Sequence, residues 1–214
     1  MVKINRFRGI AALLVLLGGT FPLFAQPAPV SILVLGDSLT AGYGLAPEEA
    51  FPVKLEQRLK KEGRNVRVLN GGVSGDTSAG GRARLDWALA DKPDAVIVEL
   101  GANDGLRGLE PAQMKDNLDA IIADLKKRNI AVLLAGMRAP PNFGPRYGAE
   151  FDAVYPSLAK KHAVPLYPFF LDGVAAEPAL NQRDGIHPNR DGVRVIVDRI
   201  TSYVLRLLDS LKEE

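Results

Sequence analysis

The 214-residue sequence contains no cysteine and only two histidines, His162 and His187. The lack of cysteine excludes disulfides, thiolate metal sites and thiol nucleophiles. It also excludes a lipid anchor on a cysteine behind an N-terminal apolar segment. Any catalysis must therefore use oxygen nucleophiles, carboxylates and one of the two imidazoles.

The N-terminal apolar segment is too short to be a membrane span. Its uninterrupted part, residues 10–17, ends at Gly18 and Gly19, and Pro22 follows. A helix that crosses a bilayer needs about 20 apolar residues. A membrane anchor is therefore the less favoured interpretation of this segment.

The same segment has the pattern of a secretory signal peptide. Basic residues precede the apolar run, and Ala25 provides a small residue at a cleavage position. We expect residues 1–25 to be removed, although Ala28 is an alternative site because Leu23 is not the small residue preferred three positions before the cut. The remaining domain, residues 26–214, is expected to be exported to the periplasm or secreted.

Neither sign of charge dominates the exported part. The chain has 27 basic and 25 acidic residues, and loss of Lys3, Arg6 and Arg8 leaves 24 against 25, a net charge of −1. This balance does not favour nucleic acid or an anionic membrane surface as a partner. We expect a small-molecule substrate, no binding of nucleic acid, and no stable membrane insertion after signal cleavage. The sequence does not determine the oligomeric state.

The length of the remaining chain fits one domain, and its hydrophobic pattern predicts an α/β fold. Five short apolar runs are near-continuous, as in parallel strands covered on both faces: Val30 to Leu35, Val66 to Leu69, Ala95 to Leu100, Ile130 to Ala135 and Val164 to Tyr167. Helical spacing lies between them, with helices expected near residue 51, from Pro111 and from about Arg190. Alternation of strands and helices predicts a three-layer α/β/α sandwich with a five-stranded parallel sheet.

Polar residues follow the predicted strands at the edge where such sheets bind ligands. Ser38 follows the first run, a glycine-rich loop with Gly75 follows the second, and Asn103 follows the third. Asp184 and His187 lie in a loop before the last helix. We expect these four segments to converge on one edge.

This set of residues predicts a serine hydrolase. A serine hydroxyl needs a nearby base, and that base needs a group that orients it. His162 ends a helical stretch, so we interpret it as a solvated or capping residue. His187 is then the only feasible base, with Asp184 three residues before it as the orienting acid. Considered without the other residues, Ser38 would be interpreted as a helix N-cap or a turn serine.

Attack on an acyl carbon creates an oxyanion that needs hydrogen-bond donors. The candidate donors are the backbone amides of Ser38 and Gly75 and the side-chain amide of Asn103. Gly75 could instead be a turn glycine and Asn103 part of an Asx-turn.

The motifs resemble the SGNH, or GDSL, hydrolase family. The resemblance is carried by Gly36-Asp37-Ser38-Leu39, Val73-Ser74-Gly75-Asp76-Thr77, Gly101-Ala102-Asn103-Asp104 and Asp184-Gly185-Ile186-His187-Pro188. It implies a flavodoxin-like sheet with strand order 2-1-3-4-5, Ser38 as nucleophile, Gly75 and Asn103 in the oxyanion hole, and Asp184 with His187 as a dyad. It implies no cofactor. The chain looks most like the exported bacterial thioesterases, lysophospholipases and arylesterases of that family.

The expected function is hydrolysis of carboxylic esters, thioesters or lysophospholipids through an acyl-enzyme. A carbohydrate acetyl esterase of the same fold is an alternative. A different class, a metal-dependent phosphoesterase, would use Asp37, Asp104, Asp184 and His187 as metal ligands. A binding module with a decayed site is disfavoured because none of the catalytic residue types is missing.

Overall fold

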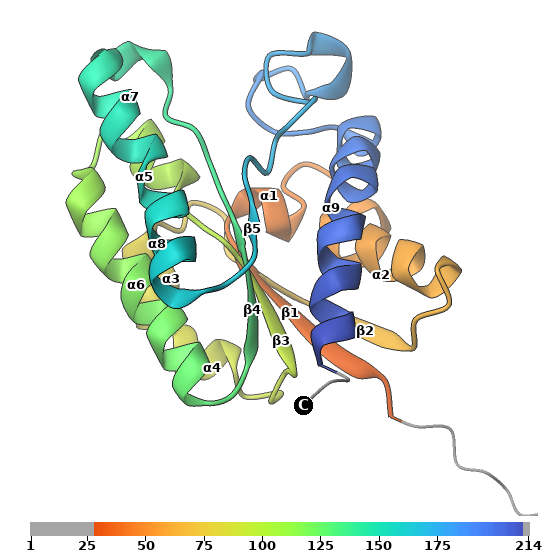
Figure 1. Cartoon of the computed structure of the whole chain (residues 1–214). Coiled ribbons are helices and arrows are strands. Elements are labelled where there is room, and N and C mark those ends of the chain that lie inside the picture. The colour runs from red at the N-terminus through yellow and green to blue at the C-terminus, as the bar shows by residue number, and fades with distance from the viewer. Residues whose placement is uncertain (1–27, 212–214) are drawn as a thin grey trace, which may run out of the picture.

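A computed structural model describes residues 28–211 as a parallel sheet with helices on both faces (Figure 1). The expected signal peptide, residues 1–25, lies outside the described residues. The strands are β1 (Val30–Gly36), β2 (Val66–Gly72), β3 (Ala95–Glu99), β4 (Ala131–Ala135) and β5 (Leu166–Tyr167). All neighbours pair in parallel in the order β2-β1-β3-β4-β5, which confirms the predicted sheet.

Each predicted apolar run supplies one strand, but β5 is shorter than expected. Only Leu166 and Tyr167 pair with β4, and the two residues lie between Pro165 and Pro168. Proline has no N–H to donate to a strand ladder. The prolines therefore restrict β5 to a two-residue edge strand.

The helices form two layers, with α2 and α9 on one face and α3, α6 and α8 on the other (Figure 1). The α-helices are α1 (Ser38–Ala41), α2 (Phe51–Lys61), α3 (Ser78–Ala83), α4 (Leu85–Ala88), α5 (Ala102–Leu106), α6 (Pro111–Lys127), α7 (Gly144–Asp152), α8 (Val154–His162) and α9 (Arg190–Ser210). Three short 3₁₀ turns are η1 (Pro47–Glu49), η2 (Pro141–Phe143) and η3 (Pro178–Leu180). None of the helices between residues 28 and 211 combines the length and apolar character of a membrane span.

Helix α9 shows how the hydrophobic pattern places an element. Val193, Ile196, Ile200 and Val204 recur at three- and four-residue spacing, and all four side chains are buried. The Asn189 side chain accepts hydrogen bonds from the first backbone amides of the helix. The loop that carries the predicted base is therefore tied to a fixed helix start.

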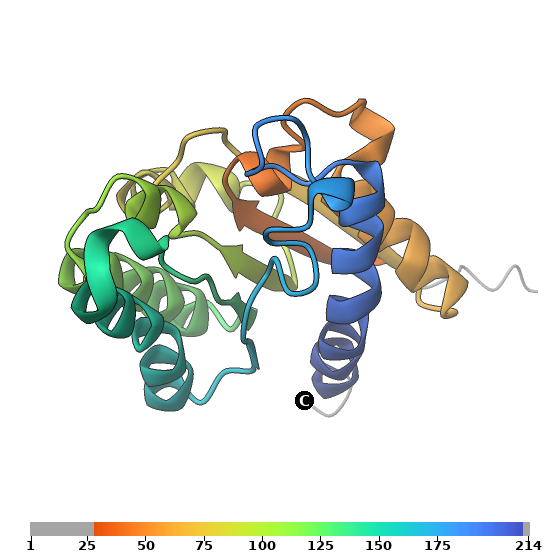
Figure 2. The same ribbon diagram turned by 90° about the horizontal axis from the view of Figure 1, so that it is seen from above.

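The carboxyl edge of the sheet brings distant segments together. Seen from above, the segment before α9 lies beside α1 (Figure 2). A hydrogen bond of 2.7 Å from Gln182 Nε2 to the carbonyl oxygen of Tyr43 joins the two segments. The predicted nucleophile and base thus come from opposite ends of the chain to one place.

Candidate active site

Ser38 is the first residue of α1, and only Asp37 separates it from the strand end at Gly36. The Asp37 side chain caps this short helix, because its Oδ1 accepts a hydrogen bond from the Leu39 amide at 2.9 Å. The strand end and the capped turn leave the Ser38 backbone little freedom. The hydroxyl is therefore held at the carboxyl edge of the sheet.

Ser38, His187 and Asp184 form a continuous hydrogen-bonded chain. Ser38 Oγ lies 2.9 Å from His187 Nε2. His187 Nδ1 lies 2.7 Å from Asp184 Oδ2. When Nδ1 carries the proton and donates to the carboxylate, Nε2 is free to accept the serine proton.

Backbone donors hold Asp184 in its ionised form. Its Oδ1 accepts the amides of His187 at 3.0 Å and Ile186 at 2.9 Å. These hydrogen bonds, together with the one to the His187 ring, lower the pKa of Asp184 to about 2. The carboxylate therefore remains charged at any pH above about 3.

Two residues that we did not predict from the sequence hold the histidine loop. The Gln182 backbone amide donates to the His187 carbonyl at 2.7 Å, while the Gln182 side chain reaches Tyr43. The rings of Tyr43 and His187 have centroids 4.7 Å apart. Tyr43, which is 54% exposed, thus lies against the imidazole at the edge of the site.

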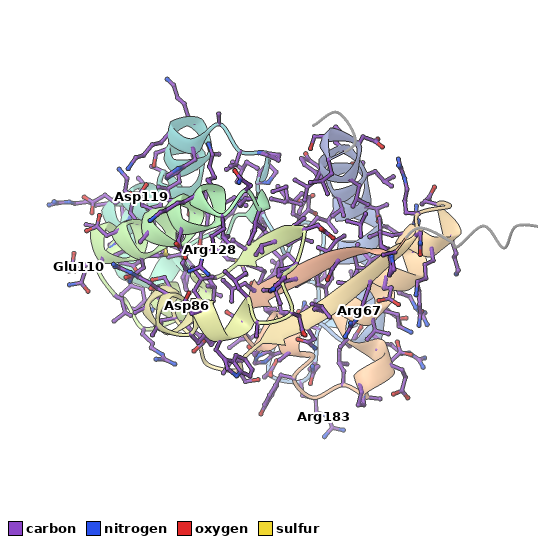
Figure 3. The ribbon with its side chains drawn as sticks, turned by 90° about the horizontal axis from the view of Figure 1, so that it is seen from below. Arg67, Asp86, Glu110, Asp119, Arg128 and Arg183 are labelled. Atoms are coloured by element: carbon purple, nitrogen blue, oxygen red, sulfur yellow. The ribbon has the colours of Figure 1, made fainter. Side chains whose placement is uncertain are left out.

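The other histidine has a different environment from the one we expected. His162 is the last residue of α8, but its side chain is mostly buried and Nε2 lies 2.7 Å from Asp119 Oδ1 on α6. Of the two alternatives expected for His162, a solvated or a capping residue, the solvated one is therefore wrong. Asp119 and Arg183, the neighbour of Asp184, appear at well-separated places in Figure 3. His162 therefore takes no part in the Ser38 site.

The loops of Gly75 and Asn103 are bound to each other. Gly75 has a φ of +84°, which favours glycine, and its carbonyl oxygen accepts Arg107 Nη2 at 2.7 Å. Three residues later, the Ser78 amide and hydroxyl donate to the buried Asp104 carboxylate at 2.7 and 2.6 Å. Since Asp104 follows Asn103 directly, these bonds fix one predicted donor loop relative to the other. Asn103 itself lies in the first turn of α5, which begins at Ala102.

A buried acidic pair lies beneath this edge. Asp37 and Glu99 are both fully buried, and Thr40 Oγ1 donates to Glu99 Oε2 at 2.7 Å. A Cβ at Gly36 would lie 2.1 Å from Thr40 Oγ1 and 2.5 Å from Glu99 Oε2. Glycine is therefore required before Asp37, because any side chain would displace this hydrogen bond.

Burial raises the pKa of Asp37 to about 6. It also raises the pKa of Glu99 well above its usual range, and the charge of Asp37 acts in the same direction. Each carboxyl binds its proton more tightly in the folded than in the unfolded state. The contribution of Asp37 and Glu99 to the free energy of unfolding is therefore largest below about pH 4. It decreases as the pH rises through the pKa values that the two carboxyls have in the folded protein.

We predict that Glu99→Gln becomes more stable relative to the wild type as the pH increases from 4.5 to 8. The glutamine cannot ionise, so the variant lacks this pH-dependent loss. The relative gain is about 1.4 kcal/mol for each unit by which burial raises the pKa of the carboxyl. Urea unfolding of both proteins at several pH values measures it.

Glu48→Gln is the matched control because Glu48 is exposed. Its stability relative to the wild type should change little over the same pH range. A constant difference between Glu99→Gln and the wild type would show that Glu99 ionises normally in the folded protein.

The three aspartates that a metal site would need are occupied by protein donors. Asp37 accepts from Leu39 and Asn103, Asp104 accepts from Ser78, and Asp184 accepts from His187. Within residues 28–211, no three acidic, histidine or cysteine side chains are grouped so that they could hold a metal ion. The arrangement is that of a hydrogen-bonded serine site.

One of the residues missed from the sequence carried a detectable signal. Glu99 is a charged residue at the end of an apolar run predicted to be a buried strand, and a buried charge needs a partner. Ser78, Arg107 and Gln182 carried no such signal. Their contacts depend on which loops meet, and local sequence does not encode that.

Comparison with known proteins agrees with this geometry. Residues 34–195 match the model of the GDSL-like lipase/acylhydrolase family. The chain is 46% identical to esterase TesA of Pseudomonas aeruginosa over 78% of its own length and 83% of that protein. It is 45% identical to the thioesterase 1/protease 1/lysophospholipase L1 of Escherichia coli, over 87% and 88% of the two chains.

A solved structure shares the whole architecture. The crystal structure of the psychrotrophic esterase EstA from Pseudoalteromonas, inhibited by monoethylphosphonate, superposes with a TM-score of 0.80 at 35% identity. The match covers 84% of this chain and 99% of that one. The chain is therefore an ester-bond hydrolase and belongs to the GDSL-like lipase/acylhydrolase family.

Proposed function

We propose that ester hydrolysis proceeds through an acyl-enzyme on Ser38. The observation that carries this proposal is the chain of hydrogen bonds of 2.9 and 2.7 Å from Ser38 through His187 to Asp184. Ser38 Oγ attacks the acyl carbon while His187 Nε2 takes its proton. The resulting imidazolium is stabilised by the Asp184 carboxylate and then protonates the leaving group. Water, activated by the same imidazole, releases the acid in the second half of the reaction.

The tetrahedral oxyanion is stabilised by the backbone amides of Ser38 and Gly75 and by the side-chain nitrogen of Asn103. Support comes from two hydrogen bonds that join the three segments at one edge: Asn103 donates to the Asp37 carboxylate, and Arg107 donates to the Gly75 carbonyl. Each such donor typically accounts for about 10²–10³ in kcat.

Exposed apolar side chains around this edge provide a surface for the acyl group. Among the described residues, the exposed large hydrophobic side chains other than Trp87 all lie at the carboxyl edge, in loops or at the ends of α5 and η2: Tyr43, Val73, Leu106, Leu109, Phe143 and Ile186. The Phe143 ring packs on Gly108, where a Cβ would lie 2.5 Å from it. We infer that this surface, called the acyl rim, contacts medium-length acyl chains.

The substrates proposed are aryl and acyl esters, with thioesters and lysophospholipids as further candidates. The names of relatives, an arylesterase among them, support these classes. We further propose that residues 1–25 direct export, followed by cleavage after Ala25 or Ala28, because the basic and apolar pattern is that of a signal peptide. Coenzyme A esters are cytoplasmic, so an exported enzyme meets lipid or xenobiotic esters instead.

A panel of p-nitrophenyl esters from acetate to palmitate tests the substrate class, with lysophosphatidylcholine and palmitoyl-CoA beside it. We expect kcat/KM to increase from acetate to medium chains, because each buried CH₂ is worth about 0.8 kcal/mol, roughly fourfold. It should level off once the chain extends beyond the acyl rim.

The same panel is run after dialysis against EDTA. Unchanged rates are expected of a serine esterase, and loss of activity that added Mg²⁺ or Zn²⁺ restores would contradict the acyl-enzyme proposal. A maximum on acetate with a steady decrease toward longer chains would contradict the role of the acyl rim and favour an acetyl esterase.

A further inference from the structure

Asp37 contacts both the segment of the nucleophile and that of an oxyanion donor. Its Oδ1 caps the helix of Ser38 through the Leu39 amide at 2.9 Å, and its Oδ2 accepts Asn103 Nδ2 at 3.0 Å. The side chain is fully buried. One carboxylate therefore sets the position of two segments that lie 66 residues apart.

The second of these bonds determines which way the Asn103 amide faces. A carboxylate only accepts hydrogen bonds, so it selects the rotamer that points the nitrogen, not the oxygen, toward Asp37. The nitrogen has a second N–H, which remains available for another acceptor. With the amide flipped, Asn103 Oδ1 would face Asp37 Oδ2, and two acceptors would repel each other. The Asp37 carboxylate therefore disfavours the flipped amide.

Asp37 is ionised above about pH 6, because burial raises its pKa to about 6. Glu99 is fully buried as well, and burial raises its pKa well above the usual range, so it holds its proton more tightly than an exposed glutamate does. Thr40 donates to Glu99, not to Asp37. The acceptor that Asn103 meets above pH 6 is therefore an anion with no donor hydrogen of its own.

We propose that Asp37 is a positioning residue for oxyanion stabilisation and that it acts by holding the Asn103 amide with its nitrogen toward the developing charge. This inference rests on the proposed role of Asn103 in the oxyanion hole. It assigns to Asp37 a function in the reaction beyond that of a helix cap.

The variant Asp37→Asn separates the two functions of the side chain. Asparagine caps helices as well as aspartate does. If its oxygen keeps the bond to Leu39, its NH₂ group faces the NH₂ group of Asn103, and the Asn103 amide must turn away. We expect kcat to decrease about 10- to 100-fold, with KM changed less than threefold, because the loss affects the transition state and not substrate binding.

A double-mutant cycle with Asn103→Ala distinguishes positioning from general destabilisation. Asn103→Ala alone should lower kcat about 10²–10³-fold. In the Asn103→Ala background, Asp37→Asn should lower kcat by less than a further threefold, because the side chain that Asp37 positions has been removed. Thr201→Val is the control, because it removes a buried hydroxyl of α9 far from Ser38 and should leave kcat unchanged.

The cycle has three informative outcomes besides the expected one. If the losses of the two substitutions multiply, Asp37 acts independently of Asn103 and the inference is overturned. If Asp37→Asn alone has no effect on kcat, the inference is overturned as well. If Asn103→Ala retains the kcat of the wild type, Asn103 is not an oxyanion donor, and the positioning role of Asp37 is overturned together with that assignment.

A second variant covers the case in which Asp37→Asn does not fold. Asp37→Ser retains a helix cap for α1 but removes the second oxygen, Oδ2, that accepts from Asn103. It should give the same decrease in kcat and the same lack of additivity with Asn103→Ala. Near-wild-type kcat in this variant would equally overturn the proposal.

Discussion

Replacing Ser38 by alanine should lower kcat for ester hydrolysis by roughly 10⁴–10⁶-fold. The substitution removes the atom that bonds to the acyl carbon, and no other hydroxyl is hydrogen-bonded to His187 among the contacts of residues 28–211. The fold should be retained, because α1 is capped by Asp37 and not by the serine. Steady-state kinetics with a p-nitrophenyl ester and circular dichroism measure the two effects.

Ser157→Ala is the matched control. Ser157 lies on α8, and its hydroxyl bonds only to the Val154 carbonyl. This variant should hydrolyse esters at the wild-type rate. Mass spectrometry after treatment with an organophosphonate should show one covalent adduct on the wild type and on Ser157→Ala, and none on Ser38→Ala. An adduct on Ser38→Ala would place the nucleophile elsewhere.

The two histidines should respond oppositely to substitution. His187→Ala removes the base at 2.9 Å from Ser38 Oγ, so kcat should decrease roughly 10⁴–10⁶-fold, comparable to Ser38→Ala. The double variant should be little worse than either single one, because residues that act as a unit are not additive. Kinetics of the three variants at pH 8 test this.

His162→Ala is the control for this pair of results. Its partner Asp119 is partly exposed, so loss of their contact should lower the free energy of unfolding by about 1 kcal/mol or less. Catalysis should remain within twofold of the wild type. Loss of activity in His162→Ala together with a fully active His187→Ala would refute the assignment of the base.

The strands were predictable because each strand of a parallel sheet buried on both faces is a short, near-continuous apolar run in the sequence. The run Val30 to Leu35 is apolar on both faces, since helices cover both, and it became β1. The β5 run was also located correctly, yet its pairing was overestimated. Apolar character marks burial, whereas pairing also needs N–H groups that Pro165 and Pro168 lack.

The candidate site was predictable only in its reactive atoms. Its place after the first strand singled out Ser38, and with only two histidines elimination left His187. Gly75 and Asn103 were candidate donors with alternative interpretations, and the resemblance to a family implied their role. His162 ends a helix as expected, but its side chain is not solvated. Its position at a helix end suggested solvent, whereas the neighbouring helix α6 provides Asp119 as a partner.

The sequence by itself determined the layers of the fold and the residue types available for chemistry, because both follow from local pattern and composition. Only the tertiary structure decided that Asp37 accepts from Asn103, that Glu99 lies buried beneath them, and that Arg107 binds Gly75. These contacts join loops that are separated by tens of residues. Their geometry results from how helices on both faces pack the sheet, and no short stretch of sequence specifies that packing.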